Sequence, residues 1–426
     1  MINWIEENLG TSSYNFARSN DELCIIDVRD MVDKVGNFES VILDKINSAV
    51  LAINQGNKVV ICCDYGISRS NGIAIGVCSV LRNMDFFEAT KYVVEKIGKK
   101  EIKPEIISAV YKALNPDKCN CEENNVLLTG GSGFIGSKLR PLLDKGNNVY
   151  APARSELELS DSLALDIYVK KNKISYILHL ANPRIYNGVS ALGETVSILR
   201  NVLGVCEVNN VHLMYVSCWE VYSGYRAASL LASEHLPLFP KGLYGETKMI
   251  CELLIKTVAK NNAFKHTIVR SSAVYGEGAD KPKFLSNFSE KASKNREIFV
   301  HEYANGLPCL DLIYIDDLID ILAKVVNSKT TGEFNIGTGV LTSTTEIANL
   351  IKNHVKSESK IATRAVQSYW ANIAMDITKT RNLFNWMPSI DVETGIKRCI
   401  DFANDMVRRE VTYESNIRCR AEHNQA

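Results

Sequence analysis

The chain has 426 residues, of which 46% are hydrophobic and 23% are charged. This length is too great for one hydrophobic core, so we expect two or three folding units with a soluble, globular composition. Lysine plus arginine and aspartate plus glutamate number 49 each, giving a formal net charge of zero. This balance argues against a protein that bulk charge holds to nucleic acid or membrane.

The sequence contains no recognisable targeting segment. No apolar run approaches the roughly 20 residues that span a bilayer, and MINWIEENLG lacks the basic flank and apolar centre of a signal peptide. The twelve cysteines follow no framework spacing, so we expect reduced thiols in a cytoplasmic protein. Cys119 and Cys121 lack a second pair of ligands at zinc spacing, so no metal site is predicted.

The first domain is predicted over residues 1–115 and is of the α/β class. Residues 24–28 and 58–62 are short, β-branched and bounded by polar residues, which is typical of buried strands. Residues 38–53 have helical spacing and end near Gly56.

The second of these strands leads into the sequence CDYGISRS. The loop is expected to point backbone N–H groups inward as a phosphate nest, and to lower the pKa of Cys63 so that its thiolate is a nucleophile. Arg69 can bind two phosphoryl oxygens, and Ser70 can donate to the leaving thiolate. This pattern resembles the CxxGxxRS loop of the cysteine-based dual-specificity phosphatases, which implies a phosphorylated substrate.

Two details of this resemblance stay open. The family's histidine before the nucleophile is replaced by Cys62, which places a partner for a strained disulfide or a sulfenic acid nearby. A carboxylic acid must also protonate the leaving oxygen, and the spacing within IDVRDMVDK favours Asp30, with Asp33 second. A domain that binds phosphate without turnover is the alternative.

Residues 116–124 have no apolar periodicity and are predicted to be a linker, and residues 411–426 a polar tail. Between them, residues 125–410 alternate between strand and helix, which predicts a doubly wound parallel sheet. Strands are expected at 126–130, 148–153, 176–181 and 212–217, and helices at 134–146, 161–171 and 195–210.

The sequence TGGSGFIG follows the first of these strands and opens a helix. Gly130 permits the tight turn, Gly133 lets the backbone approach a pyrophosphate, and Gly136 allows close helix–strand packing. The helix N-terminus offers free N–H groups to the phosphates. Arg154, after the second strand, suits a 2′-phosphate, so NADP is favoured over NAD.

Tyr244 and Lys248 form a YxxxK pair on one face of a predicted helix. A nearby ammonium lowers the pKa of a phenol, which is otherwise about 10. Tyr244 is therefore expected to act as an acid and base near neutral pH.

The motifs TGGSGFIG, HLAN, VSCWEVYSG, YGETK, VRSSAVYGEG, LIYIDDLIDIL and FNIGTG resemble, in this order, the extended short-chain dehydrogenase/reductase superfamily. Its sugar-nucleotide epimerases, dehydratases and reductases are the most similar in kind. The resemblance covers about residues 125–405 and implies a Rossmann domain followed by a smaller C-terminal substrate domain. It also implies that Lys248 binds the nicotinamide ribose. A homodimer is a further possibility that we consider. The residues then expected to bind the cofactor are Thr129, Gly130, Gly133, Phe134, Ile135, Gly136, Arg154, Glu158, Leu159, Leu180, Ala181, Asn201, Tyr244 and Lys248.

The chain departs from this family at two places. The hydroxyl that assists the tyrosine falls on Cys218, and because a thiol donates poorly, Ser217 competes for the role. Leu310 stands where the family has an arginine for the substrate diphosphate, with Arg364 or Lys283 as substitutes. Glu220 is either an additional acid/base or a carboxylate on the pocket rim.

Together these patterns predict a bifunctional enzyme. A cysteine phosphatase precedes an NAD(P)-dependent epimerase, dehydratase or reductase that acts on a sugar nucleotide. The alternative is a regulatory protein that senses NADP and has the phosphatase as its output.

Overall fold

The computed structural model describes residues 1–405 except 21, 35, 99–101, 116–123, 184–187, 263 and 280–282. The predicted tail, the linker up to residue 123, and both Cys119 and Cys121 lie outside the described residues. The chain divides into two compact units. The first comprises Met1–Asn124, Leu157–Ser175 and Arg200–Val211, and the second comprises Asn125–Glu156, Tyr176–Leu199 and His212–Ala426.

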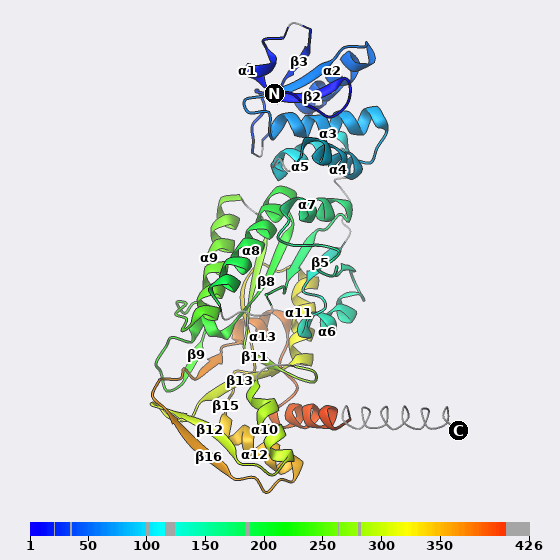
Figure 1. Cartoon of the computed structure of the whole chain (residues 1–426). Helices are drawn as coiled ribbons and strands as arrows, with labels where there is room; N and C mark the ends of the chain where they lie inside the picture. Colours follow the sequence, from blue (N-terminus) through cyan, green and yellow to red (C-terminus); the bar gives the residue numbers. More distant parts are fainter. Residues whose placement is uncertain are drawn as a thin grey trace, which may run out of the picture. The chain divides into compact units, whose positions relative to one another are not determined.

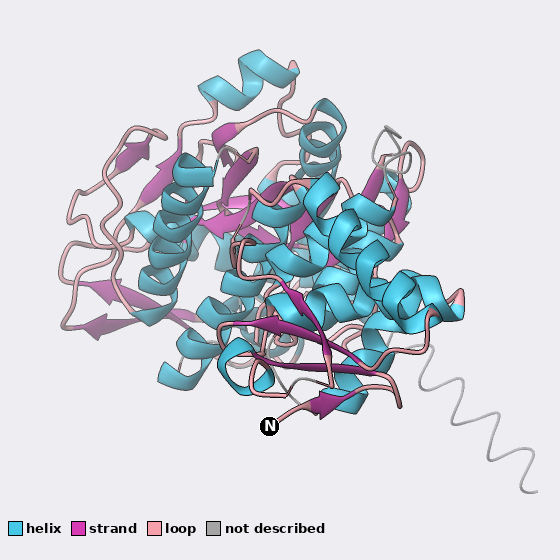
Figure 2. Ribbon diagram, turned by 90° about the horizontal axis from the view of Figure 1, so that it is seen from above, coloured by secondary structure: helices cyan, strands magenta, loops and turns pink. Residues whose placement is uncertain are grey.

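A four-stranded sheet in the order β1-β2-β4-β3 forms the centre of the first unit. The N-terminus leads into the edge strand β1, which is antiparallel to its neighbour (Figure 2), and the other strands are parallel. Their bounds are Asn3–Trp4 for β1, Leu9–Ser13 for β2, Cys24–Asp27 for β3 and Val59–Cys63 for β4. The two strands predicted here are confirmed.

Glycines let the helices of this unit pack closely. A Cβ on Gly72 would lie 2.2 Å from the side chain of Ile106, and one on Gly76 would lie 2.5 Å from that of Ile46. Helix α3 therefore lies directly against α5 and α2, which fixes the helix that follows the cysteine loop. The helices are α1 (Tyr14–Ala17), α2 (Glu39–Asn54), α3 (Arg69–Arg82), α4 (Phe86–Ile97), α5 (Pro104–Leu114) and α7 (Ser162–Lys171).

The second unit contains a six-stranded parallel sheet in the order β14-β10-β8-β7-β5-β6, of which Figure 1 labels β5 and β8. From β5 the chain moves outward to β6 and then returns to β7 on the other side, so the strand order reverses at β5. This is the doubly wound, Rossmann-like arrangement that was predicted, and ligands bind at such a reversal beyond the carboxyl ends of the strands. The bounds are β5 (Asn125–Thr129), β6 (Asn148–Tyr150), β7 (Tyr176–His179), β8 (His212–Cys218), β10 (His266–Ser271) and β14 (Gly332–Ile336).

Alternate residues of this sheet, such as Val126 and Leu128, share one core cluster with Leu139 of α6 (Phe134–Leu143) and Leu318 of α11 (Ile315–Ser328). The smaller C-terminal part adds three short sheets, with the orders β11-β13-β15, β12-β16 and β17-β9. Its strands are β9 (Leu230–Ala232), β11 (Ala273–Tyr275), β12 (Ile298–Tyr303), β13 (Cys309–Tyr314), β15 (Leu341–Ser343), β16 (Ile361–Val366) and β17 (Ile373–Met375). The remaining helices are α9 (Leu243–Asn262), α10 (Lys283–Ser293), α12 (Thr344–Val355) and α13 (Thr378–Phe384), and residues 392–405 are also helical.

Helix α8 (Val189–Asn209) is the one candidate for a membrane span among the described residues. By length and composition alone, this helix is long and apolar enough to cross a bilayer. Half of its most apolar window is buried inside the protein, and buried core helices have the same composition.

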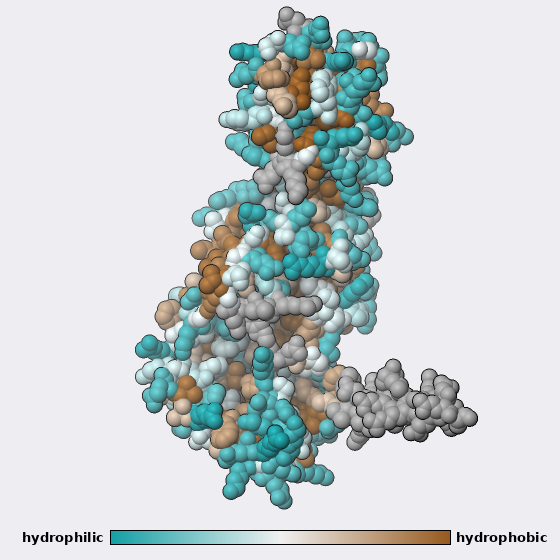
Figure 3. Space-filling model, viewed as in Figure 1, coloured by the Kyte–Doolittle hydropathy of each residue, from teal (hydrophilic) through white to brown (hydrophobic). Residues whose placement is uncertain are grey.

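The surface of the second unit that Figure 3 shows is largely hydrophilic, but apolar side chains gather over α9. Leu253 on this helix is 64% exposed. An apolar surface of this kind is typical of places where another molecule binds.

A buried ion pair anchors α9 to β10. The guanidinium of Arg270 donates to the carboxylate of Glu252 at 2.7–3.1 Å, and it also donates to the hydroxyl of Tyr222 at 2.8 Å and to the carbonyl of Glu234 at 3.2 Å. Both charged side chains are almost fully buried. Each charge therefore depends on its partner, because neither is solvated by water.

Replacing Arg270 with methionine is expected to lower the free energy of unfolding of the second unit by about 3–5 kcal/mol. The change leaves the Glu252 carboxylate buried, with Lys256 at 3.9 Å as its one remaining partner among the described residues. Urea unfolding of this unit measures the loss. The matched control is Lys324→Met, which breaks a half-exposed ion pair with Asp320 at 2.9 Å and should cost at most about 0.5 kcal/mol. Equal decreases in the free energy of unfolding of the two variants would show that the buried ion pair stabilises the unit no more than an exposed one.

Candidate functional site

The glycine loop after β5 leaves no room for side chains at two positions. Gly130 has a φ of +72°, and a Cβ there would lie 2.9 Å from the backbone nitrogen of Ala181. A Cβ on Gly136 would lie 2.3 Å from the carbonyl oxygen of Gly130. The loop is therefore closed tightly between the start of α6 and the backbone that follows β7, at Leu180 and Ala181.

This loop fits a dinucleotide pyrophosphate. Gly133 is the N-cap of α6 and has no side chain that could cap the helix. The N–H groups of the first turn therefore face the loop. This turn begins with Phe134 and Ile135. The helix N-terminus carries partial positive charge. Thr129 Oγ1 lies 2.8 Å from His179 Nδ1, which fixes the end of the strand beside the loop.

Arg154 follows β6 and its side chain is 73% exposed, with its Nη2 3.5 Å from Glu194 Oε1. Glu158, Leu159 and Asn201 belong to the first unit. There the Asn201 side chain donates to the carbonyl oxygens of Leu159 and Ser160 at 3.0 Å each. Their predicted contact with a cofactor stays a prediction.

The predicted tyrosine and lysine lie on the first turns of α9. Lys248 Nζ is 5.7 Å from the ring centre of Tyr244 and 4.7 Å from that of Tyr215. It donates to the carbonyl of Val216 at 2.9 Å and to Asn182 Oδ1 at 3.4 Å. The ammonium is thus buried and held at the end of β8, close to the phenol.

The expected effect of Lys248 on the tyrosine is wrong for this form of the protein. Burial raises the pKa of Tyr244 well above its usual value, and charge interactions with Cys218 and Glu220 add to the rise. Burial also lowers the pKa of Lys248. Burial disfavours the charged form of each group, so the phenol is protonated at neutral pH.

The structure brings Cys218 and Glu220 into the electrostatic surroundings of Tyr244, at the end of β8 and in the 3-10 helix η2 (Trp219–Tyr222). Burial raises the pKa of Cys218 to about 12, so its thiol is neutral. The hydroxyl of Ser217 is buried and has no hydrogen-bond partner among the described residues. Burial also raises the pKa of Glu220, which favours its acid form.

The substitutes for the missing arginine lie in the C-terminal part. Leu310 is buried in β13 as part of the core. The guanidinium of Arg364 lies 4.9 Å from the ring centre of Phe299, and Lys283 begins α10. Binding of a diphosphate by either cation stays a prediction.

The cysteine loop of the first unit joins the end of β4 to the start of α3. The N–H of Gly66 donates to Cys63 Sγ at 3.2 Å, and Ser70 Oγ lies 3.4 Å from the same sulfur. Burial opposes ionisation of the thiol, but hydrogen bonds from the Ser70 hydroxyl and from the N–H groups of Ser70, Ile67 and Tyr65 outweigh it and lower the pKa of Cys63. These donors favour the thiolate of Cys63, and the binding of a phosphate in the loop stays a prediction.

Gly66 has a φ of +69°, and a Cβ there would lie 2.4 Å from the backbone of Ser12. The loop therefore needs glycine at this position, because a side chain would both strain the backbone and collide with β2. This supports a loop built to bring N–H groups close to a small ligand.

Arg69 is held at the base of this loop and is only 7% exposed. Its guanidinium donates to the carbonyl of Met31 at 2.9 Å and forms an ion pair with Asp64. Its Nε lies 3.5 Å from Asp33 Oδ2 and forms no hydrogen bond among the described residues. A buried guanidinium with hydrogen-bonding capacity to spare suits an oxyanion.

The structure brings Asp33, rather than Asp30, to this arginine. Asp30 is half exposed and its carboxylate pairs with Lys45 Nζ at 2.9 Å. Asp33 Oδ1 is buried and has no hydrogen-bond partner among the described residues. The segment between β3 and α2 has no regular periodicity, so spacing alone did not identify which carboxylate faces the loop.

Cys62 points to the opposite side of β4 from Cys63. It packs with Ala17 and Val60, whereas Cys63 belongs to the main core of the unit. Burial raises the pKa of Cys62 to about 12. The expectation that Cys62 partners an oxidised Cys63 is wrong, because neighbouring strand residues face opposite sides of a sheet.

Sequence reasoning missed Asn182, which contacts Lys248, and Asp64, which contacts Arg69. Each is next to or inside a motif that was recognised. Both residues could have been predicted from their position, because each is a polar residue that follows a predicted strand or nucleophile directly.

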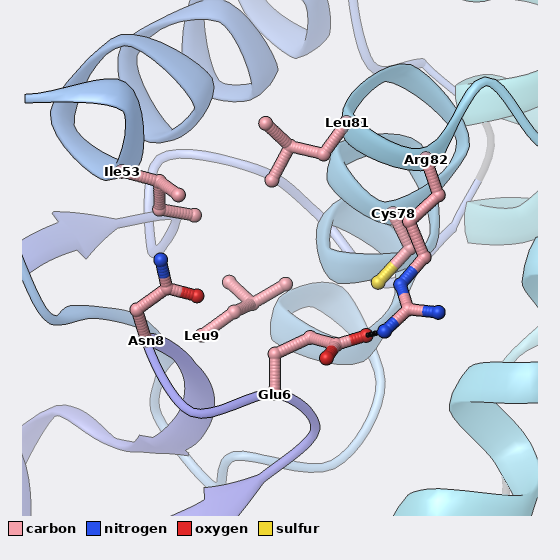
Figure 4. Close-up of a pocket in the computed structure, with 7 residues that line it drawn as sticks. All are labelled: Glu6, Asn8, Leu9, Ile53, Cys78, Leu81 and Arg82. Carbon is pink, nitrogen blue, oxygen red and sulfur yellow. Dashed lines mark ion pairs between the residues drawn. The ribbon is translucent and has the colours of Figure 1, made fainter. Parts of the chain in front are cut away.

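A separate cavity of about 220 Å³ lies at the amino ends of β2 and β4, whereas the cysteine loop follows the carboxyl end of β4. Figure 4 shows the side chains that line this cavity. Its carboxylate, Glu6, is already paired with Arg82 at 2.6 Å and with the hydroxyl of Tyr92 at 2.6 Å. The lining residues are Glu6, Asn8, Leu9, Ile53, Cys78, Leu81 and Arg82.

Residues 126–337 match the NAD dependent epimerase/dehydratase family. A putative UDP-glucose 4-epimerase of Methanocaldococcus jannaschii is 28% identical over 308 residues, which cover 65% of this chain and 97% of that protein. UDP-glucuronic acid decarboxylase 1 of Xenopus tropicalis is 23% identical over 321 residues, which cover 69% of this chain and 75% of that protein.

The crystal structure of Thermus thermophilus UDP-glucose 4-epimerase in complex with NAD resembles the present one with a TM-score of 0.58 and 20% sequence identity. The match covers 65% of this chain and 98% of that chain. At this identity the likeness shows the fold.

Proposed function

We propose that residues 126–337, which match the NAD dependent epimerase/dehydratase family, belong to an enzyme that acts on a sugar nucleotide with a bound nicotinamide cofactor. One observation carries the proposal: residues 180–182 connect the two halves of the site. Gly130 packs on Ala181, and Asn182 accepts a hydrogen bond from Lys248. The glycine loop and the YxxxK helix thus meet at the reversal of strand order, where such ligands bind.

When bound, the nicotinamide cofactor exchanges a hydride with a carbon of the sugar. Tyr244 would take the proton from, or return it to, the oxygen on that carbon, and Lys248 would hold the cofactor ribose. Glu220 would donate or accept a second proton where the reaction is an elimination or a decarboxylation. Ser217 or Cys218 would orient the substrate oxygen.

The relatives act on UDP-glucose or UDP-glucuronic acid according to their names, so we propose a nucleoside-diphosphate sugar as substrate. Incubation with UDP-glucose, UDP-glucuronic acid and dTDP-glucose, each with NAD or NADP, tests this. Mass spectrometry and NMR would separate an epimer, a decarboxylated sugar and a dehydrated sugar. If no substrate turns over while the cofactor binds, the NADP-sensing alternative replaces the enzyme.

NADP is proposed as the preferred cofactor, supported by the exposed guanidinium of Arg154. Arg154→Ala should weaken NADP binding by about 1.5–3 kcal/mol, because a charged contact is lost, and should change NAD binding little. Titration of both cofactors by intrinsic fluorescence measures this, with Arg140→Ala on the exposed face of α6 as the control. Preference of the wild type for NAD, or equal weakening of both cofactors, would contradict the assignment.

For the first unit we propose a cysteine phosphatase that acts on a phosphorylated substrate. The observation in its favour is the set of N–H and O–H donors on Cys63 Sγ beside the buried Arg69. Cys63 would attack phosphorus, Arg69 would bind two phosphoryl oxygens, and Asp33 would protonate the leaving oxygen. Phosphate binding without turnover is the second candidate, and the hydrolysis assay described below separates the two.

A further inference from the structure

The buried side chain of Lys248 is held by uncharged groups. Its Nζ donates to the carbonyl of Val216 at 2.9 Å and to Asn182 Oδ1 at 3.4 Å. The carboxylate that interacts with it, Glu252, is already paired with Arg270 at 2.7 Å. Since a buried charge is costly unless it is compensated, the ammonium depends on neutral dipoles and rings.

The ring of Tyr215 on β8 lies next to this ammonium. Lys248 Nζ is 4.7 Å from the centre of the Tyr215 ring, which is closer than its 5.7 Å to the ring of Tyr244. A cation within about 6 Å of a ring centre is attracted by the negative face of the ring, and the attraction is larger where water is excluded. Both side chains are almost fully buried, so this attraction is not screened by solvent.

The Tyr215 ring is itself positioned by β7. It stacks on the ring of His179, with centres 6.0 Å apart and planes inclined by 23°. His179 Nδ1 lies 2.8 Å from Thr129 Oγ1, at the start of the glycine loop. Burial and the charge of Lys248 lower the pKa of His179 to about 3, so the imidazole is neutral and adds no second cation. Aromatic contacts therefore connect the glycine loop to Lys248.

The other titratable groups of β8 and α9 that interact with Lys248 or its ring neighbours are neutral at pH 7. Burial raises the pKa of Cys218 to about 12 and also raises the pKa of Cys251. Burial likewise raises the pKa values of Tyr215 and Tyr244 well above their usual range. Lys248 thus meets the ring of Tyr215 as a neutral phenol, not as a phenolate.

Given the proposed role of Lys248 on the cofactor ribose, we infer that Tyr215 is a positioning residue that holds the Lys248 ammonium in place, in its charged form, through the face of its ring. An ammonium has three N–H donors, and Val216 and Asn182 accept two of them. The ring attracts the charge without forming an ion pair, so the third N–H stays available to a ribose hydroxyl. A carboxylate in the same place would compete with the ribose for that donor.

The test follows the charge of Lys248 by NMR in the full-length protein without cofactor. The protein is labelled with ¹³C-lysine, and the Cε resonance that disappears in Lys248→Met is followed as the pH is raised. Tyr215→Phe keeps the ring and removes the hydroxyl, so it should titrate like the wild type. Tyr215→trifluorophenylalanine keeps the shape but weakens the negative face of the ring, so Lys248 should lose its charge about one pH unit lower.

Tyr215→Leu is the second variant, because it removes the ring and should shift the titration of Lys248 in the same direction. The matched control is Phe334→trifluorophenylalanine. The Phe334 ring lies 4.6 Å from Lys379 Nζ, and the change should leave the titration of Lys248 as in the wild type.

Titration of NADP at several pH values provides a second measurement. Affinity should fall at a lower pH in Tyr215→trifluorophenylalanine than in the wild type or Tyr215→Phe. Identical titration of Lys248 with phenylalanine and with trifluorophenylalanine at position 215 would overturn the inference alone. If neither NAD nor NADP binds to the wild type, the proposed function is overturned instead, while the Lys248 resonance still decides whether the ring holds the charge.

Discussion

Replacing Tyr244 with phenylalanine is expected to lower turnover of the sugar nucleotide by about 10²–10⁴-fold. The change removes the one hydroxyl that can exchange a proton with the substrate, and it leaves Lys248 and the glycine loop in place. Cofactor affinity should therefore change by less than about twofold, since an isosteric ring keeps the packing. Steady-state kinetics and a cofactor titration on the same preparation measure both quantities.

The control for this experiment is Tyr168→Phe, which removes a phenol hydroxyl from α7 and should leave turnover near the wild-type value. Residual turnover above about a tenth of the wild-type rate in Tyr244→Phe would assign the proton transfer to another residue. Glu220 and Cys218 are then the candidates, because both interact electrostatically with Tyr244.

Replacing Cys63 with serine is expected to eliminate hydrolysis of a simple aryl phosphate under reducing conditions. A serine hydroxyl remains protonated in the loop and cannot act as the nucleophile, even though the N–H groups of the nest are retained. Phosphate should still bind to the variant. Release of the coloured phenol measures turnover, and competition by phosphate in the wild type shows that the loop is the site.

Asp33 and Asp30 provide an internal comparison for the same reaction. Asp33→Asn should slow hydrolysis of esters with poor leaving groups by about 10²–10⁴-fold and should affect an activated aryl phosphate much less. Asp30→Asn should have little effect, because its carboxylate pairs with Lys45. The opposite result would return the acid role to Asp30. A wild type that hydrolyses neither aryl phosphates, phosphopeptides nor sugar phosphates would leave phosphate binding as the function of this unit.

Local patterns were sufficient to predict the parts of this fold that depend on backbone periodicity and on glycine. The strands that end at Cys63 and Thr129 lie where the β-branched runs placed them, and Gly66 and Gly130 have positive φ values that other residues rarely adopt. The glycine loop and the YxxxK pair could be recognised because each motif is defined by residue types at fixed distances along the sequence.

Other properties of the sites depend on contacts between distant segments. The raised pKa of Tyr244 comes from burial by surrounding elements, and no spacing rule contains that information. Likewise, Asp33 reaches Arg69 through the path of an irregular segment. The opposite orientations of Cys62 and Cys63, in contrast, could have been predicted, because successive side chains of a strand point to opposite faces of the sheet.

The buried ion pair between Glu252 and Arg270 also restricts the motion of α9, the helix that carries Tyr244. Glu252 lies two turns after Tyr244 on the same helix, and its partner lies in the central sheet. We therefore expect the amide hydrogens of α9 near Glu252 to exchange slowly, through large-scale opening of the unit. If Tyr244 transfers the proton as proposed, we expect the loops around α9, and not the helix itself, to adjust to substrates of different shape.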